Sequence, residues 1–139
     1  MSRGLVCEWE LLRVHEMMKP HIIPVLHLSS LALEPFEYRP VPEKILSGDP
    51  LQRAWSYYSD SSGKFSVGVW ECEPGAWRIH YTEQEYCRIV AGRSRITNDD
   101  GVIREVITGD EFVIPRGLTG IWEVIERTRK IYVICEYAN

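Results

Sequence analysis

The sequence has few cysteines, and they form no recognisable motif. Cys7, Cys72, Cys87 and Cys135 are far apart and include no CxxC pair, which argues against a zinc knuckle or a small disulfide scaffold. Long hydrophobic runs are also missing, and charged residues interrupt the first twenty positions. Neither a membrane span nor a signal-peptide core is therefore predicted. We expect reduced thiols, a cytoplasmic location and no membrane partner.

Basic runs are missing as well. The 16 lysines and arginines are spread along 139 residues whose formal net charge is -4. Without a basic segment, nucleic acid is not an expected partner. Hydrophobic residues make up 45% of the chain and charged residues 26%, and the length suffices for one buried core. The composition therefore predicts a single globular domain.

The N-terminal part differs from the rest in its residue pattern and its proline content. Residues 5–18 carry apolar side chains near helical spacing, which predicts a short amphipathic helix, with a disordered extension as the alternative. Six of the eight prolines lie in residues 20–53, where they exclude a regular helix and predict extended pieces lying over a core. We assign residues 1–40 to an N-terminal extension, made of a possible helix and an extended arm, and residues 41–139 to one barrel domain.

From residue 54 onward, short strands follow one another. Alternating or β-branched segments are separated by turn-rich links such as DSSGK, TNDDG and RGLTG. The predicted strands cover residues 54–59, 65–72, 77–81, 85–92, 102–107, 111–115, 120–125 and 130–137. A series of short strands without intervening helices predicts an all-β sandwich or barrel.

Five segments carry a resemblance to a known family: SGDP (47–50), GVWECEPG (68–75), EYCRIVAGR (85–93), GDEFVIPRGLTGIWEV (109–124) and RKIYVI (129–134). With these segments the chain resembles the cupin superfamily. Its closer likeness is to the cupin_3 (DUF861) group, which includes ureidoglycine aminohydrolase-like and ethanolamine-utilization EutQ-like domains. The resemblance implies a cupin-type double-stranded β-helix, or jelly-roll barrel. Because small cupins often pair, it also implies a homodimer.

Metal-binding cupins hold one divalent ion with three histidines and a glutamate from these motifs. The resemblance matches the glutamate to Glu85, but Gly120 stands at the third histidine position, and the first pair falls on Arg78 and His80 or one residue later. Two protein ligands rarely hold a transition metal tightly. No cofactor is therefore predicted, with a divalent metal at Glu85 and His80 as the alternative.

Strand alternation groups the side chains that would line the barrel interior. On residues 77–81, either Trp77, Ile79 and Tyr81 face inward or Arg78 and His80 do, and the apolar character favours the first set. The predicted ligand-binding residues are Trp70, Trp77, Cys87, Trp122 and Tyr132. Such a pocket would hold a small amino, ureido or carboxylate metabolite through cation–π contact and a carboxylate hydrogen bond, with Gly120 leaving space for it. Alternatively, the tryptophans simply fill the barrel.

Glu85, Tyr81 and Lys130 form the predicted catalytic set if the protein is an enzyme. A carboxylate among aromatic groups suits a general acid or base. The alternative for Glu85 is an ion pair with an arginine or with Lys130, and Lys130 could instead pair with Glu123 or Glu126 across a hairpin.

Cys87 would be a nucleophile only beside a basic group, and otherwise it is an inert buried thiol. The sequence therefore predicts a small-molecule-binding cupin. The alternative is an enzyme of the hydrolase, lyase or isomerase type acting on the same class of compound.

Overall fold

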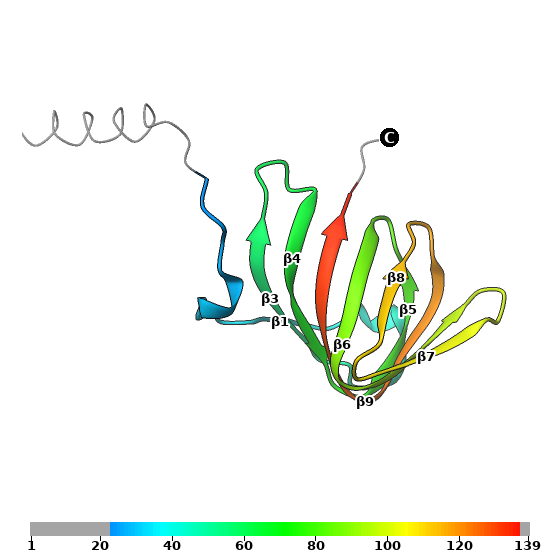
Figure 1. Ribbon diagram of the computed structural model, residues 1–139. Coiled ribbons are helices and arrows are strands. Elements are labelled where there is room, and N and C mark those ends of the chain that lie inside the picture. Colours follow the sequence, from blue (N-terminus) through cyan, green and yellow to red (C-terminus); the bar gives the residue numbers. More distant parts are fainter. Residues whose placement is uncertain (1–22, 137–139) are drawn as a thin grey trace, which may run out of the picture.

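The computed structural model describes residues 23–136, which form a curled antiparallel β-structure (Figure 1). Its elements are η1 Leu28–Ser30, β1 Phe36–Tyr38, η2 Pro42–Lys44, β2 Ile45–Gly48, β3 Gln52–Ser59, β4 Phe65–Cys72, β5 Gly75–His80, β6 Gln84–Asn98, β7 Ile103–Ile107, β8 Glu111–Ile114 and β9 Thr119–Cys135. The all-β prediction is confirmed. The helix predicted over residues 5–18 lies outside the described residues. Within residues 23–136, no helix has the length and apolar character needed to cross a membrane.

Two long bent strands, β6 and β9, belong to both halves of the barrel. The C-terminal half of β9 pairs with β4 and with the start of β6, and its N-terminal half pairs with β5 and with the end of β6. The remaining strands complete two sheets, in the orders β1-β3-β4-β9-β6-β8 and β2-β5-β9-β6-β7. Figure 1 shows the two sheets diverging from the bends in β6 and β9, which is the arrangement of a jelly-roll barrel.

A glycine lies at the bend of β6. Gly92 has a φ of 90°, and a Cβ at this position would lie 1.9 Å from the carbonyl oxygen of Arg127 on β9. The register between β6 and β9 shifts here, between Ile89 and Ser94. The sequence predicted a strand end at residue 92 and a break between residues 125 and 130. Both predictions are wrong, because β6 and β9 pair with each other through the bend and continue as single strands.

The core between the sheets is aromatic. Trp70, Trp77 and Trp122 are buried, and the centroids of their rings lie 5.5 to 6.4 Å apart. They come from β4, β5 and β9, which are neighbours, so alternation along each strand brings the three rings to one face. Phe112 of β8 packs against Trp122 from the other side, at 6.3 Å between centroids. The tryptophans therefore tie the two sheets together.

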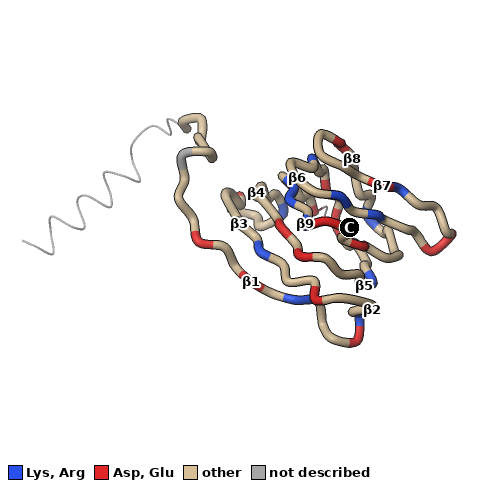
Figure 2. Tube along the Cα trace, turned by 90° about the horizontal axis from the view of Figure 1, so that it is seen from below, with Lys and Arg blue, Asp and Glu red and all other residues tan. Residues whose placement is uncertain are grey.

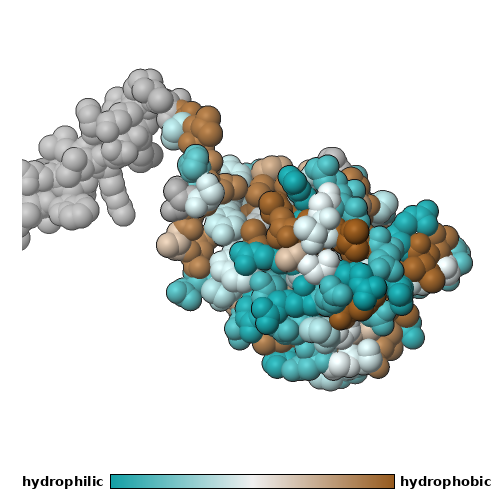
Figure 3. Space-filling view, turned by 60° about the horizontal axis from the view of Figure 1, so that its bottom comes forward, coloured by the Kyte–Doolittle hydropathy of each residue, from teal (hydrophilic) through white to brown (hydrophobic). Residues whose placement is uncertain are grey.

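Residues 23–35 form an arm that leaves the barrel (Figures 1 and 3), and hydrophobic side chains are exposed along it. The exposed fraction reaches 85% at Ile23 and 93% at Val25. The sequence assigns the following strand, β1, to the extension, and in the structure β1 pairs with the edge of β3. The domain boundary and the homodimer stay predictions.

Charges of both signs alternate along the chain (Figure 2). On the outer face of β3, β4 and β9, Glu71 lies 3.6 Å from Arg53 and from Arg129, and Glu73 lies 3.0 Å from Arg127. These pairs are partly buried, with the Glu71 side chain 13% exposed. Trp55 shares this face, where the guanidinium of Arg129 lies 4.9 Å from the centroid of its ring.

Candidate functional site

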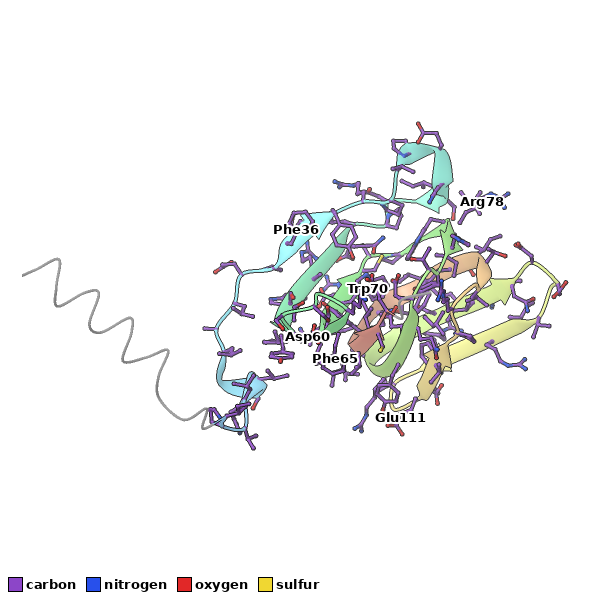
Figure 4. The ribbon with its side chains drawn as sticks, turned by 90° about the horizontal axis from the view of Figure 1, so that it is seen from above. Phe36, Asp60, Phe65, Trp70, Arg78 and Glu111 are labelled. Atoms are coloured by element: carbon purple, nitrogen blue, oxygen red, sulfur yellow. The ribbon has the colours of Figure 1, made fainter. Side chains whose placement is uncertain are left out.

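A cavity of about 250 Å³ opens beside the tryptophan core. Six strands, β1, β3, β4, β5, β6 and β9, contribute to its walls, as does the link between β5 and β6. Its lining residues are Tyr38, Gln52, Ala54, Trp70, Trp77, Tyr81, Glu83, Glu85, Lys130, Tyr132 and Ile134. Most of the predicted site residues therefore meet in one place. Figure 4 shows Trp70 in the interior, with Phe36 and Arg78 toward the periphery.

A buried ion pair forms the polar centre of this cavity. Nζ of Lys130 lies 2.8 Å from Oε1 of Glu85, and the two side chains are 4% and 6% exposed. Glu85 is at the start of β6 and Lys130 is on the C-terminal half of β9, which are paired strands. The structure therefore selects the pairing with Lys130 for Glu85, and the predicted alternatives of Glu123 or Glu126 for Lys130 are wrong. Glu123 pairs instead with Arg95, at 3.1 Å.

Two indole rings cover the ammonium group. Nζ of Lys130 lies 4.7 Å from the centroid of the Trp70 ring and 4.5 Å from that of Trp122. At such distances a cation is attracted by the negative face of the ring, more strongly when water is excluded. The aromatic faces predicted for a cationic ligand are therefore used by the protein's own lysine. The indole N–H of Trp122 is buried and has no hydrogen-bond partner among residues 23–136.

Gln52 extends the polar network across β3 and β4. The indole Nε1 of Trp70 donates a hydrogen bond of 2.7 Å to Oε1 of Gln52. Because an indole N–H only donates, this bond fixes the orientation of the amide and directs its NH₂ group elsewhere. Gln52 is one of the residues that line the cavity. Gln52 therefore brings a hydrogen-bond donor to the cavity wall.

The two carboxylate oxygens of Glu85 differ in their surroundings. Oε1 receives the ammonium of Lys130 and the thiol of Cys87, whose Sγ lies 3.4 Å away. In the part of the chain that the structure describes, Oε2 has no hydrogen-bond partner. Oε2 is therefore the acceptor that this side chain offers to a ligand.

The titratable groups around the ion pair are shifted by burial and by its charges. Burial alone lowers the pKa of the Lys130 ammonium, but the charge of Glu85, with smaller contributions from Tyr81 and Cys87, more than offsets this and raises it. Lys130 is therefore a charged donor at neutral pH and does not act as a base. Burial raises the pKa of the Tyr81 hydroxyl, although the charge of Lys130 opposes the shift. Both groups keep their protons.

The same burial acts on Cys87. It raises the pKa of the thiol to about 12, with Lys130 opposing and Glu85 adding to the shift. A thiolate is the reactive form of cysteine, so this environment is the opposite of what a nucleophile needs. Cys87 belongs to the core, and although it contacts Glu85 it does not line the cavity.

Residues 77–81 face the way that the apolar character of Trp77, Ile79 and Tyr81 predicted, with these side chains directed inward. Trp77 is buried and Tyr81 lines the cavity, whereas Arg78 and His80 are exposed. The strand therefore directs His80 away from Glu85.

The alternative metal site at Glu85 and His80 does not fit this geometry. Its imidazole is on the outer face, and its carboxylate already holds an ammonium at 2.8 Å, which would repel a divalent cation. Among residues 23–136, no group of three His, Cys, Asp or Glu side chains is placed to hold a metal ion. We derive no chemistry through a metal at this site.

Gly120 is buried for a reason that the sequence did not reveal. A Cβ here would lie 1.9 Å from the carbonyl oxygen of Thr97 on β6. The expectation that Gly120 leaves space for a ligand is wrong, because the backbone of β6 fills that space. A histidine could not stand here without moving one of the strands.

Five cavity residues are missing from the sequence prediction: Tyr38, Gln52, Ala54, Glu83 and Ile134. Gln52 stands two residues before the first strand predicted from the sequence, and Tyr38 lies in the segment assigned to the extension. Neither position carries a local motif. The alternation of the real β3, which begins at Gln52, would have placed this glutamine on the same face as Ala54.

The place of Tyr132 depends on a glycine on the neighbouring strand. Gly68 is the register partner of Tyr132, and a Cβ at Gly68 would lie 2.3 Å from the tyrosine hydroxyl oxygen. The ring therefore lies over the glycine. Burial raises the pKa of the Tyr132 hydroxyl, and the charge of Glu85 adds to the shift.

Known structures share this fold. A protein of unknown function of the DUF861 family from Pseudomonas syringae pv. tomato superposes with a TM-score of 0.67 and 24% identity. The match covers 76% of this chain and 45% of that protein, so the chain spans less than half of its length.

Two further structures are similar at lower scores. The Clostridium difficile EutQ protein matches with a TM-score of 0.57 and 19% identity, over 63% of this chain and 69% of that one. The Cnp3 cupin domain of Schizosaccharomyces pombe matches with a TM-score of 0.54 and 18% identity, over 62% and 65%. At such identities the likeness shows the fold alone. No curated protein matches the chain.

The family model described as the EutQ-like cupin domain, Cupin_3, matches residues 59–132, which are more than half of the chain. This segment extends from the end of β3 to Tyr132 and includes Glu85 and Lys130. The jelly-roll barrel and the matched segment agree with the motifs found in the sequence, and the chain belongs to the EutQ-like cupin domain family.

Proposed function

We propose that the protein binds a small neutral metabolite carrying an amide or ureido group, in the cavity beside Glu85 and Lys130. The observation that carries the proposal is the buried ion pair, which leaves Oε2 of Glu85 without a protein partner. Oε2 is not among the fully buried polar atoms of residues 23–136 that lack a partner, so it is reached from the cavity and can accept a hydrogen bond from a ligand. The NH₂ group of Gln52 adds a hydrogen-bond donor in the wall of the same cavity.

Charge favours a neutral ligand over an ionic one. Lys130 and Glu85 neutralise each other, so a buried carboxylate on the ligand would have no counter-charge, and an ammonium would have only the partly exposed Glu83. The faces of Trp70 and Trp122 are already occupied by Nζ of Lys130. An amide or ureido group carries both an N–H for Glu85 and a carbonyl for Gln52. Among the amino, ureido and carboxylate compounds expected from the sequence, this class fits best.

Size points to a small compound. The cavity volume of about 250 Å³ is below the roughly 300–1,000 Å³ that is typical of pockets for drug-sized ligands. Aromatic walls would contact the apolar part of the ligand while the polar groups fix its orientation.

Ligand-observed NMR with four compounds of similar size tests the proposal. Acetamide and methylurea are expected to bind, and acetate and methylammonium are not. The double variant Glu85→Met/Lys130→Met removes both charges together and is expected to lose acetamide binding. The control variant Arg95→Gln/Glu105→Gln removes exposed ion pairs on the other sheet and is expected to bind normally. Preferential binding of acetate or methylammonium would contradict the neutral-ligand proposal.

A second candidate is catalysis on the same class of compound, with Glu85 as general base. Oε2 faces the ligand cavity with no protein partner, as a base must. Lys130, which stays protonated, and Tyr81 would orient the substrate. Glu85→Gln keeps the size of the side chain and an acceptor oxygen but cannot take up a proton. Turnover that survives in Glu85→Gln would exclude this role, whereas binding without turnover in the wild type would leave the first proposal alone.

A further inference from the structure

One wall of the cavity comes from outside the matched domain. Tyr38 of β1 lines the cavity, and its register partner on β3 is Gln52. Phe36 pairs with Ala54, which also lines the cavity. The rings of Phe36 and Tyr38 stack, with centroids 5.6 Å apart. The wall on this side is therefore formed by β1 together with the β3 residues that it covers.

The Tyr38 side chain is coupled to the polar centre of the site. Burial raises the pKa of its hydroxyl, and the charge of Lys130 and the indole of Trp70 oppose the shift. The hydroxyl therefore stays protonated and can donate or accept a hydrogen bond.

The attachment of β1 to the barrel is weak. Its ladder with β3 comprises three residue pairs, whereas the β3–β4 ladder comprises seven. All three residues of β1 are exposed, and Phe36 is 71% exposed. Edge strands held by few hydrogen bonds and little buried apolar surface open most readily.

Two exposed ion pairs supply further attachment. Arg53 of β3 lies 2.9 Å from Glu37, and Arg39 forms hydrogen bonds of 2.7 and 3.1 Å with the carboxylate of Asp49. Both pairs are at the surface, where salt screens them. They lie outside the cavity, so they can be removed without changing its lining.

We propose that β1 is an openable wall of the cavity, that its separation from β3 admits small solutes to Trp70 and Lys130, and that Tyr38 contacts the bound ligand when the wall is closed. Opening uncovers Gln52 and Ala54 on β3. Closure returns the Tyr38 hydroxyl to the cavity and excludes water from the ion pair. The contact of Tyr38 with a ligand rests on the proposed binding function, whereas the opening of β1 does not.

Iodide quenching of tryptophan fluorescence tests the opening without any ligand. In a Trp9→Phe/Trp55→Phe background, the remaining tryptophans are Trp70, Trp77 and Trp122, all in the core. Total ionic strength is kept constant with chloride. Each exposed pair contributes modestly, so Glu37→Gln/Arg39→Gln is expected to raise the quenching constant about two- to tenfold.

Two further variants distinguish iodide access through β1 from a general loosening of the barrel. Arg95→Gln/Glu105→Gln, which removes surface pairs of β6, β7 and β9, is expected to leave quenching unchanged. Tyr38→Ala removes the wall side chain but keeps both ion pairs of β1, and is expected to raise quenching. Hydrogen exchange measured by mass spectrometry should show faster exchange of residues 36–38 and 52–54 in Glu37→Gln/Arg39→Gln, with β4 and β9 unchanged. Equal quenching in the wild type, Glu37→Gln/Arg39→Gln and Tyr38→Ala would overturn the proposal.

The ligand contact is tested with acetamide. Tyr38→Phe keeps the ring and removes one hydroxyl, so the affinity for acetamide is expected to fall about two- to tenfold. Unchanged affinity would overturn the contact. If acetamide does not bind even the wild type, the proposed function and the Tyr38 contact fail, while the quenching experiment still decides whether β1 opens.

Discussion

Nζ of Lys130 lies 2.8 Å from Oε1 of Glu85, and almost no water reaches either side chain. The ammonium is also 4.5 Å from the centroid of the Trp122 ring, and the Tyr81 hydroxyl and the Cys87 thiol are close enough to affect its pKa. Taking two charges out of water is expensive, and their attraction repays this only when the geometry is good. The pair is therefore poor evidence of stability by itself, and its place beside a cavity agrees with the proposed role in ligand binding.

The stability of single and double variants separates the attraction between Glu85 and Lys130 from the cost of burying each charge. Glu85→Met and Lys130→Met each leave one buried charge without a partner, which is expected to lower the free energy of unfolding by about 3–5 kcal/mol. The double variant leaves no charge and is expected to recover most of that loss. Urea unfolding of the three variants gives the coupling energy. Additive losses in the double variant would contradict the pairing.

In the proposed site, the NH₂ group of Gln52 donates a hydrogen bond to the carbonyl of the ligand. Gln52→Glu keeps an oxygen for the indole N–H of Trp70 but replaces the NH₂ group by a second acceptor. Acetamide binding, measured by ligand-observed NMR, is expected to weaken at least about tenfold, because the ligand carbonyl loses its donor and meets a like-charged oxygen. Wild-type affinity in this variant would show that Gln52 does not contact the ligand.

Alkaline pH is expected to destabilise the fold through two buried thiols. Burial raises the pKa of Cys72 and of Cys87 to about 12, whereas an unfolded cysteine ionises near 8.5. A raised pKa contributes stability that is present below the unfolded value and is lost as the pH rises toward the folded value. From pH 8 to pH 10 the two thiols together should cost about 4 kcal/mol. Urea unfolding under reducing conditions measures this loss.

The control for this prediction is the double variant Cys72→Ala/Cys87→Ala. It lowers stability at all pH values through the lost side chains, but the decline between pH 8 and pH 10 is expected to flatten. A decline as steep as in the wild type would assign the effect to other groups.

Gly120 tests the close approach of β9 to β6. A methyl group at this position would lie 1.9 Å from the carbonyl oxygen of Thr97, so Gly120→Ala is expected to lower the free energy of unfolding by about 3 kcal/mol or more. Gly63→Ala is the comparison, because no atom lies within 4 Å of a Cβ there and only the φ of 71° opposes it. That cost is about 1–2 kcal/mol. Equal losses in the two variants would show that β6 and β9 separate easily.

Divalent metal is expected to have no effect on stability. Two of the positions implied for ligands hold Gly120 and an exposed His80, and Glu85 is engaged by Lys130. Elemental analysis of protein purified without a nickel column, together with melting curves before and after treatment with a chelator, tests this expectation. One equivalent of bound metal, with a melting temperature that falls on chelation, would contradict the site geometry.

The sequence by itself determined the fold class, the family resemblance and the inward parity of Trp77 and Tyr81. These features are local, because alternation, turn residues and motif spacing are written along the chain. The same reasoning placed Glu85 and Lys130 among the site residues. It left open whether they pair, since each had other charged partners much closer along the sequence.

Only the tertiary structure decided what these residues contact. The pairing of Glu85 with Lys130, the coverage of Lys130 by Trp70 and the approach of Thr97 to Gly120 all join separate strands. The unbroken course of β9 was also hidden, because its continuity depends on pairing with β6 and not on its own sequence. Tyr38 lines the cavity because β1 pairs with the edge of β3. Contacts between strands are set by register and by bends, which local sequence patterns do not specify.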